Sequence, residues 1–160
     1  MEVEELLEEL VSFANEMGLF YEDLGLPRAW GKMLGWLLVC EPELQSAEDF
    51  ANVLQGSRGS VSMTTRALIR AGMVERRTIP GDRRTYYRIR PESWTAVLEE
   101  QQQNTKKLRT LAERGLGLLS GKPAEHRHRL EEMHSLMAFC ERELPGLIDR
   151  WRSERAAERQ

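Results

Sequence analysis

The chain has 160 residues, 41% of them hydrophobic and 31% charged, which suits one compact domain or one small domain with long helical extensions. No apolar run approaches the ~20 residues that span a bilayer, and the acidic start MEVEELLEEL lacks the basic segment of a secretory signal. The two cysteines, Cys40 and Cys140, are too few for a disulfide scaffold and lack metal-ligand spacing. We therefore expect a cytoplasmic protein that needs no cofactor.

Basic residues are concentrated in one block of the sequence. Between Gly56 and Arg90 there are nine arginines and no lysine against Glu75 and Asp82, a net charge of +7 that leaves −10 for the rest of a chain whose total is −3. A basic block inside an acidic protein is typical of a protein that binds a polyanion. The alternative is a solvated arginine-rich surface without a partner.

Two amphipathic helices are predicted before this block. Pro27 opens the second of them, which ends before Glu41-Pro42. In it Gly31 and Gly35 lie one turn apart and predict a close approach of another helix. The segment GLFYEDLGLP between the two helices is predicted to be a loop. The first helix covers residues 2–17, and its apolar stripe contains Leu6, Leu7, Leu10, Val11, Phe13, Ala14 and Met17.

A helix-turn-helix pattern follows. Ser46 and Asp49 have the spacing of a capping box and predict a short helix that Gly56 closes. Ser57 can cap the next helix, which ends at Gly72. Two short helices with a tight turn between them form the motif. On the second helix, Val61, Thr65, Leu68 and Ile69 should face inward, and Arg58, Gly59, Ser62, Met63, Arg66 and Arg70 should face outward.

After Gly72 the spacing of apolar residues changes from that of a helix to that of a strand. MVERRTI and RTYYRIR flank Pro80-Gly81-Asp82, which predicts a β-hairpin with an arginine-rich tip. This order of elements predicts a winged helix-turn-helix, mainly α with a small β-hairpin wing, plus long N- and C-terminal dimerisation helices. A helix of this kind fits the major groove of DNA, and a wing can lie along phosphates or enter the minor groove.

The C-terminal part is predicted to be two long helices. The first runs from Pro91 to Leu119, and Pro145-Gly146 predicts a kink or a restart in the second. The last helix has apolar residues at heptad spacing, called the heptad seam below. By itself this seam fits packing within the chain and a dimer interface about equally, but the presence of a DNA-binding motif in the same chain favours a dimer. The expected domains are residues 1–25 for dimerisation, 26–90 for DNA binding and 91–160 for dimerisation. The seam contains Leu130, Met133, Met137, Cys140, Leu144, Leu147 and Trp151.

The stretch from Ala51 to Ile89 resembles the winged-helix core of MarR-type bacterial transcription regulators. The strings LPRAWGKMLGWLL and SRGSVSM are similar to the GbsR-like branch of that family, and the resemblance covers residues 26–90. The resemblance implies a two-fold dimer on a pseudo-palindromic duplex. It gives Asp82 the role of orienting Arg84 toward DNA. At Arg66 this chain departs from many relatives, which have an acidic or small residue there. The candidate DNA-binding residues are Ser57, Arg58, Ser60, Ser62, Met63, Arg66, Arg70, Asp82, Arg83 and Arg84.

The sequence therefore predicts a sequence-specific regulator that binds duplex DNA, with a dimeric repressor released by a small-molecule effector as the expected mode. The alternative is a winged-helix module that docks protein or RNA without reading DNA sequence. No catalytic site is predicted, since the three histidines (His126, His128 and His134) all lie in the last helix, away from the serines of the motif.

Two further features concern sensing. Cys40 and Cys140 lie among apolar neighbours and neither neighbourhood is electropositive, which favours a structural role over redox sensing. A group of aromatic residues lies where members of the family bind effectors. Core packing is the favoured interpretation of this group and an aromatic cage for a quaternary ammonium ion is the alternative, so the effector-binding residues stay unassigned. The group contains Phe20, Tyr21, Trp30, Trp36 and Trp94.

Overall fold

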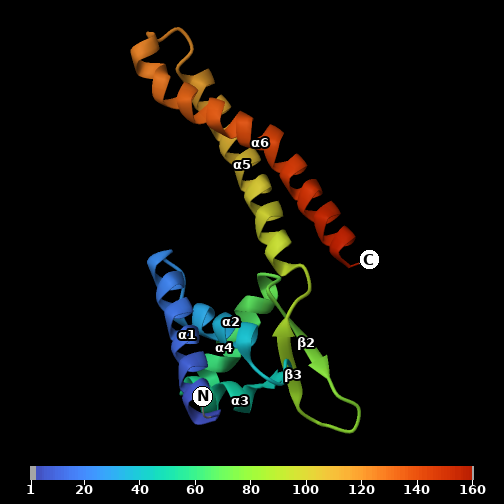
Figure 1. Ribbon diagram of the computed structural model, residues 1–160. Helices are drawn as coiled ribbons and strands as arrows, with labels where there is room; N and C mark the ends of the chain where they lie inside the picture. The colour runs from blue at the N-terminus through green and yellow to red at the C-terminus, as the bar shows by residue number, and fades with distance from the viewer. Residues whose placement is uncertain (1–2, 160) are drawn as a thin grey trace. The chain divides into compact units, whose positions relative to one another are not determined.

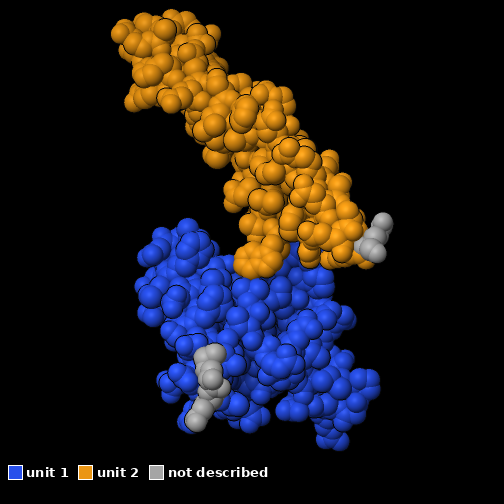
Figure 2. All heavy atoms as spheres, viewed as in Figure 1, with its two compact units in different colours: residues 1–93 blue, residues 94–160 orange. Residues whose placement is uncertain are grey.

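The computed structural model describes residues 3–159 and divides the chain into two compact units, residues 1–93 and 94–160 (Figure 2). The first unit holds α1 (Val3–Asp23), α2 (Arg28–Val39), α3 (Ala47–Leu54) and α4 (Arg58–Arg70), together with three strands (Figure 1). The strands are β1 (Gln45–Ser46), β2 (Val74–Thr78) and β3 (Thr85–Ile89). The second unit is built from α5 (Ser93–Leu118) and α6 (Ala124–Glu158). The winged helix-turn-helix fold class is confirmed.

Helix α2 is the centre of the first unit. It is buried from Gly31 to Leu37 except at Lys32, and its side chains form one core with Phe50 of α3 and Leu68 of α4. Trp36 lies in this core, and its indole Nε1 donates a hydrogen bond of 2.8 Å to Oε1 of Gln45. The burial of α2 between Gly31 and Leu37 explains why this stretch is apolar on most sides of the helix.

The close helix approach predicted at Gly31 and Gly35 is confirmed. A Cβ added at Gly31 would lie 2.1 Å from the carbonyl oxygen of Met17 in α1, and one at Gly35 would lie 2.9 Å from Cα of Ala14. The predicted loop over GLFYEDLGLP is partly wrong, because α1 continues through Gly18 to Asp23. Gly18 is itself buried against α2, where the side chain of Lys32 leaves no space for a Cβ. Tertiary contact at a small residue thus overrides the low helix propensity of glycine.

The helix-turn-helix has the predicted caps. Ser46 Oγ accepts a hydrogen bond from the backbone N–H of Asp49, and the carboxylate of Asp49 accepts one from the backbone of Ser46, which completes the capping box. Ser57 caps α4 by accepting a hydrogen bond from the backbone N–H of Ser60. The expected end of α3 was displaced by one residue, because Gln55 rather than Gly56 takes the left-handed conformation, with φ 52°. Gly72, with φ 73°, ends α4 as predicted.

The predicted hairpin is β2 and β3, paired antiparallel from Val74 opposite Ile89 to Thr78 opposite Thr85. A third strand, β1, pairs with β3 and completes a sheet of order β1-β3-β2. The sequence did not predict β1, since two residues are too short for any alternation of apolar and polar side chains.

Helices α5 and α6 form an antiparallel hairpin of their own. Trp151 Nε1 donates a hydrogen bond of 3.0 Å to Thr95 Oγ1 at one end, and Leu130 contacts Gly115 toward the other. Between them Arg109 pairs with both Glu113 and Glu141. The predicted heptad seam therefore packs, at both ends, against α5 of the same chain.

Of the kink or restart predicted at Pro145, the restart is wrong, because α6 continues through this residue as one helix. Contacts on both sides hold the helix: Glu141 is paired to Arg109, and Ile148 is buried. These contacts outweigh the backbone hydrogen bond that a proline removes.

Gly31→Ala is expected to destabilise the chain by about 1–3 kcal/mol, since the new methyl group would overlap backbone of α1 that cannot move aside cheaply. Gly59→Ala is the matched control in the same unit, because Gly59 lies in α4 with nothing within 4 Å of an added Cβ. The control should be neutral or stabilising by up to ~1 kcal/mol. Urea denaturation followed by circular dichroism measures both. Equal midpoints for the two variants would contradict the close crossing.

Candidate nucleic-acid interface

The outward face of α4 is built as the sequence predicts. Val61, Thr65 and Leu68 are buried and Ile69 is half-buried, which fixes the rotation of the helix about its axis. Met63 is 68% exposed although it is apolar, so this side chain is available to a partner. The other residues expected on this surface are also exposed: Ser57, Arg58, Ser60, Ser62, Arg66 and Arg70.

Local hydrogen bonds occupy part of this surface. Ser57 Oγ is used as the cap of α4, and Arg66 Nε donates a hydrogen bond of 3.2 Å to the carbonyl oxygen of Ser62. The terminal nitrogens of Arg66 remain available, and they are the pair that forms an end-on bidentate contact. Ser62 retains its hydroxyl for a partner.

The wing tip is held by a small polar cluster. Both oxygens of the Asp82 carboxylate lie 3.2 Å from Arg84 Nε, and Oδ2 lies 2.9 Å from Arg84 Nη2. Oδ1 also accepts a hydrogen bond from the backbone N–H of Arg84 at 2.9 Å. The structure thus brings Asp82 and Arg84 together in the geometry that the wing motif implies. Arg83 is exposed beside them.

Tyr86 is a third member of the cluster that sequence reasoning missed. Its hydroxyl donates a hydrogen bond of 2.6 Å to Asp82 Oδ2, and the guanidinium of Arg84 lies 5.3 Å from the centre of its ring. Tyr86 lies in β3, whereas Asp82 and Arg84 lie in the turn before it, so strand alternation alone could not have placed the three together. The cluster limits the directions in which Arg84 can point.

These contacts shift the ionisation of Asp82. Hydrogen bonds from Arg84 first and Tyr86 second stabilise the carboxylate and hold the pKa of Asp82 far below its usual range. A folded-state pKa below the unfolded value means that the interaction stabilises the folded wing above about pH 4 and is lost as the pH falls. At neutral pH Asp82 and Arg84 are therefore charged, while Tyr86 keeps the proton that it donates to Asp82.

The nine arginines of the basic block divide into two sets. Arg84 is paired to Asp82, while Arg77 and Arg88 both pair with Glu75 at 3.2 and 2.8 Å. These three stabilise the wing. No ion pair involves the other six in the described part of the chain, which leaves Arg58, Arg66, Arg70, Arg76, Arg83 and Arg90.

Two hollows border this surface. One of about 470 Å³ is lined by Arg58 of α4 and Arg84 of the wing, beside the N-terminus of α3. The other, of about 560 Å³, lies between α4 and β2 and is lined by Arg66, Arg70 and Arg76 among others. Each hollow is thus lined by at least one arginine of α4 and one of the hairpin.

Other candidate groups take structural positions. Burial raises the pKa of the Cys40 thiol to about 11, so this thiol is not activated at neutral pH. His134 Nε2 lies 3.2 Å from Glu113 on α5. Among residues 3–159, no group of three His, Cys, Asp or Glu side chains could hold a metal ion, and no helix is long and apolar enough to cross a membrane.

The aromatic residues do not form one cage in the first unit. Phe20 and Tyr21 make an edge-on ring contact at 5.9 Å, whereas Trp36 lies in the core with its indole bonded to Gln45. Trp30 is half-buried against that core, and Trp94 belongs to the second unit. For Trp30 and Trp36, core packing is therefore the correct interpretation.

Known proteins are similar to this chain in sequence and fold. Residues 36–86 match the model of the MarR family, and residues 92–154 match that of MmpR5-like MarR family transcriptional regulators. The HTH-type transcriptional regulator MmpR5 of Mycobacterium tuberculosis is 39% identical over 94% of this chain and 90% of its own length. A crystal structure of a transcriptional regulator has 39% identity and a TM-score of 0.75, covering 91% of this chain and 99% of the other.

The carboxyl carbon of Asp82, followed by NMR during an acid titration, should titrate well below the ordinary aspartate value of about 3.9. Arg84→Gln removes the principal stabilising donor and should move the midpoint up toward the ordinary value. Tyr86→Phe removes the second donor and should move it by less. An unchanged midpoint in Arg84→Gln would show that Asp82 does not hold Arg84 in solution.

Proposed function

The chain belongs to the MarR family of transcriptional regulators and is a DNA-binding regulator, and from that premise we propose that it reads a specific duplex sequence through α4 and the β2–β3 wing. The observation that carries the proposal is the surface of α4. Its apolar side is locked into the core, while Ser62, Met63 and Arg66 are exposed on the opposite side. Base edges in the major groove offer a distinct pattern of donors and acceptors to such a helix.

The family resemblance drawn from the sequence is confirmed, but its GbsR-like branch is not, since the match to the C-terminal part is to MmpR5-like regulators. A regulator family of this kind is not an enzyme family. The alternative of a protein- or RNA-docking module has no observation in its favour. A quaternary ammonium effector, the alternative considered for the aromatic group, also lacks a specific observation.

Arg66 and Arg84 take different roles in the proposal. Arg66 lies one turn beyond Ser62 on the outward side of α4, where its free terminal nitrogens suit the O6 and N7 atoms of guanine. Arg84 lies at the wing tip, and its side chain is already oriented by Asp82. From there it suits a phosphate or the minor groove, which position the protein but carry little sequence information. Ser57, Arg58, Ser60, Arg70 and Arg83 complete the proposed DNA-binding surface.

We further propose that the protein acts as a homodimer on a pseudo-palindrome, as a repressor that a small molecule releases. Support for the dimer comes from apolar side chains left exposed on the helices outside the motif. Leu6 and Leu7 of α1 are 42% and 46% exposed, and Leu136 and Phe139 of α6 are 56% and 51% exposed. A two-fold dimer would present two copies of α4 to successive major grooves about 34 Å apart.

The roles of the two arginines can be separated by measuring binding to an operator and to a random duplex at two salt concentrations. Arg66→Ala should cost roughly 1–3 kcal/mol per half-site on the operator and far less on random DNA. Arg84→Ala should weaken binding to both duplexes alike and reduce the salt slope by about one unit per site. Genomic duplex fragments selected by a shift assay supply the operator.

An RNA duplex of the same sequence is the control for the nature of the partner. Binding to RNA as tight as to DNA would contradict the proposed function. If Arg66→Ala lowers both DNA affinities equally, Arg66 is a phosphate contact, and specificity rests on Ser60, Ser62, Met63 or DNA shape.

Light scattering at micromolar concentration should give twice the chain mass of 18.5 kDa. Leu136→Glu should shift the protein toward the monomer, because it would place a charge within the apolar interface. Ser135→Glu is the matched control, since Ser135 is its exposed neighbour in α6 and points about 100° away around the helix. A monomeric wild-type chain, or equal effects of the two substitutions, would exclude this interface.

A further inference from the structure

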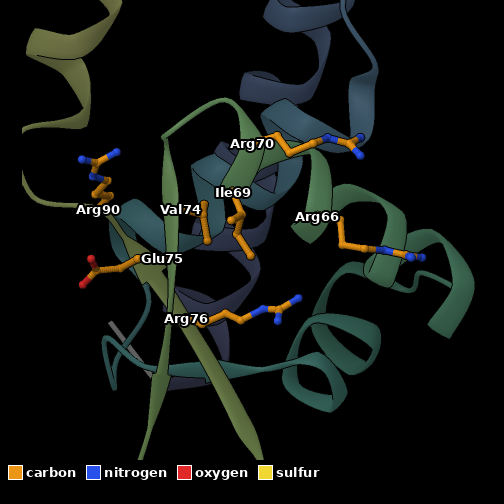
Figure 3. Close-up of a pocket in the computed structure, with 7 residues that line it drawn as sticks. All are labelled: Arg66, Ile69, Arg70, Val74, Glu75, Arg76 and Arg90. Atoms are coloured by element: carbon orange, nitrogen blue, oxygen red, sulfur yellow. The ribbon is translucent and has the colours of Figure 1, made fainter.

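In the hollow between α4 and β2, the charged side chains divide between the two sides of β2, which the sequence analysis did not predict. In Figure 3 the side chains of Arg66, Arg70 and Arg76 extend in the same direction, whereas Glu75 and Arg90 extend to the other side of β2. Arg66 and Arg70 come from α4 and were expected in a DNA-binding surface. Arg76 comes from the hairpin and was not.

The alternation of β2 explains this arrangement. Val74 and Arg76 lie on one face of the strand, and Glu75 and Arg77 lie on the other. Glu75 is occupied on its own face by Arg77 and by Arg88 of the neighbouring strand. The single acidic residue of β2 therefore compensates arginines that face away from α4.

Glu75 also lines the hollow, but its carboxylate is held by Arg77 and Arg88 and forms no ion pair with the arginines on the side of α4. No acidic side chain of the described residues lies within ion-pair distance of Arg66, Arg70 or Arg76. Val74 is 2% exposed and Ile69 is half-buried, so the floor of the hollow is apolar. Charges beside an apolar floor are screened less than charges in open water, which strengthens their attraction for an anion.

We propose that this hollow binds a backbone phosphate of DNA, with Arg70 and Arg76 as the phosphate-binding residues and Arg66 beside them on the base-reading side. The inference rests on the proposed function and deepens it, because it assigns to β2 a contact that the wing tip does not make. A hollow of about 560 Å³ has room for a phosphodiester group. Guanidinium groups from two elements can hold its oxygens from two directions.

The test compares Arg76→Ala with Arg77→Ala on the full chain. Both residues are exposed, adjacent and of equal charge, but Arg77 lies on the opposite face in its ion pair with Glu75. Arg76→Ala should weaken binding to operator and random duplex alike, about tenfold per protomer at low salt, and lower the salt slope by about one unit per protomer. Arg77→Ala should stay within about twofold of the wild type. Arg76→Lys should restore most of the salt slope, since it restores the charge.

Thermal melting of each variant establishes that the fold is retained. If the wild type binds duplex DNA and the two alanine variants behave alike, the inference is wrong and the proposed function stands. A wild type that binds no duplex would overturn both. Titration with inorganic pyrophosphate distinguishes a site for free anions: loss of pyrophosphate binding in Arg76→Ala together with unchanged duplex affinity would also overturn the inference.

Discussion

The crossing of α1 and α2 at Gly31 and Gly35 is the constraint on which the first unit depends. It lets the backbones of the two helices approach until no side chain fits between them, and so α2 becomes buried on nearly every side. Helix α4 then packs Val61 and Leu68 into the same core. Its rotation is fixed by that packing, and the outward residues have no freedom to turn inward. The close packing of α1 against α2 thus contributes to the exposure of the arginines on α4.

Charge on the wing follows from the period of a strand. The acidic residues Glu75 and Asp82 each form ion pairs with arginines of the hairpin itself. Toward α4 the hairpin offers Arg76, which forms no ion pair with any residue among 3–159. A chain with a total charge of −3 can in this way present a local surface that attracts a polyanion, because its acidic residues lie mostly elsewhere in the sequence.

Much of this could be predicted from the sequence, and the reasons are local. Caps at Ser46 and Ser57, the turn at Gly72 and the glycine spacing in α2 each have a mechanism that acts over a few residues. The features that the sequence analysis predicted wrongly or missed depend on contacts with residues distant in sequence. The extension of α1 through Gly18 needs α2 beside it, β1 needs β3, and the continuity of α6 at Pro145 depends on contacts with α5. Tyr86 and Arg76 were missed although each lies in a strand. Composition and charge counts do not say which face of the strand a residue occupies.

Methylation interference combined with hydroxyl-radical footprinting on the recovered operator tests the central claim most directly. If α4 reads base edges from a two-fold dimer, two protected stretches should lie about one helical turn apart, ~34 Å between centres. Methylation of guanine N7 within each stretch should abolish binding, because that atom is a major-groove acceptor. Uniform backbone protection without any sensitive guanine or other base would show that the protein coats DNA through its arginines and does not read it.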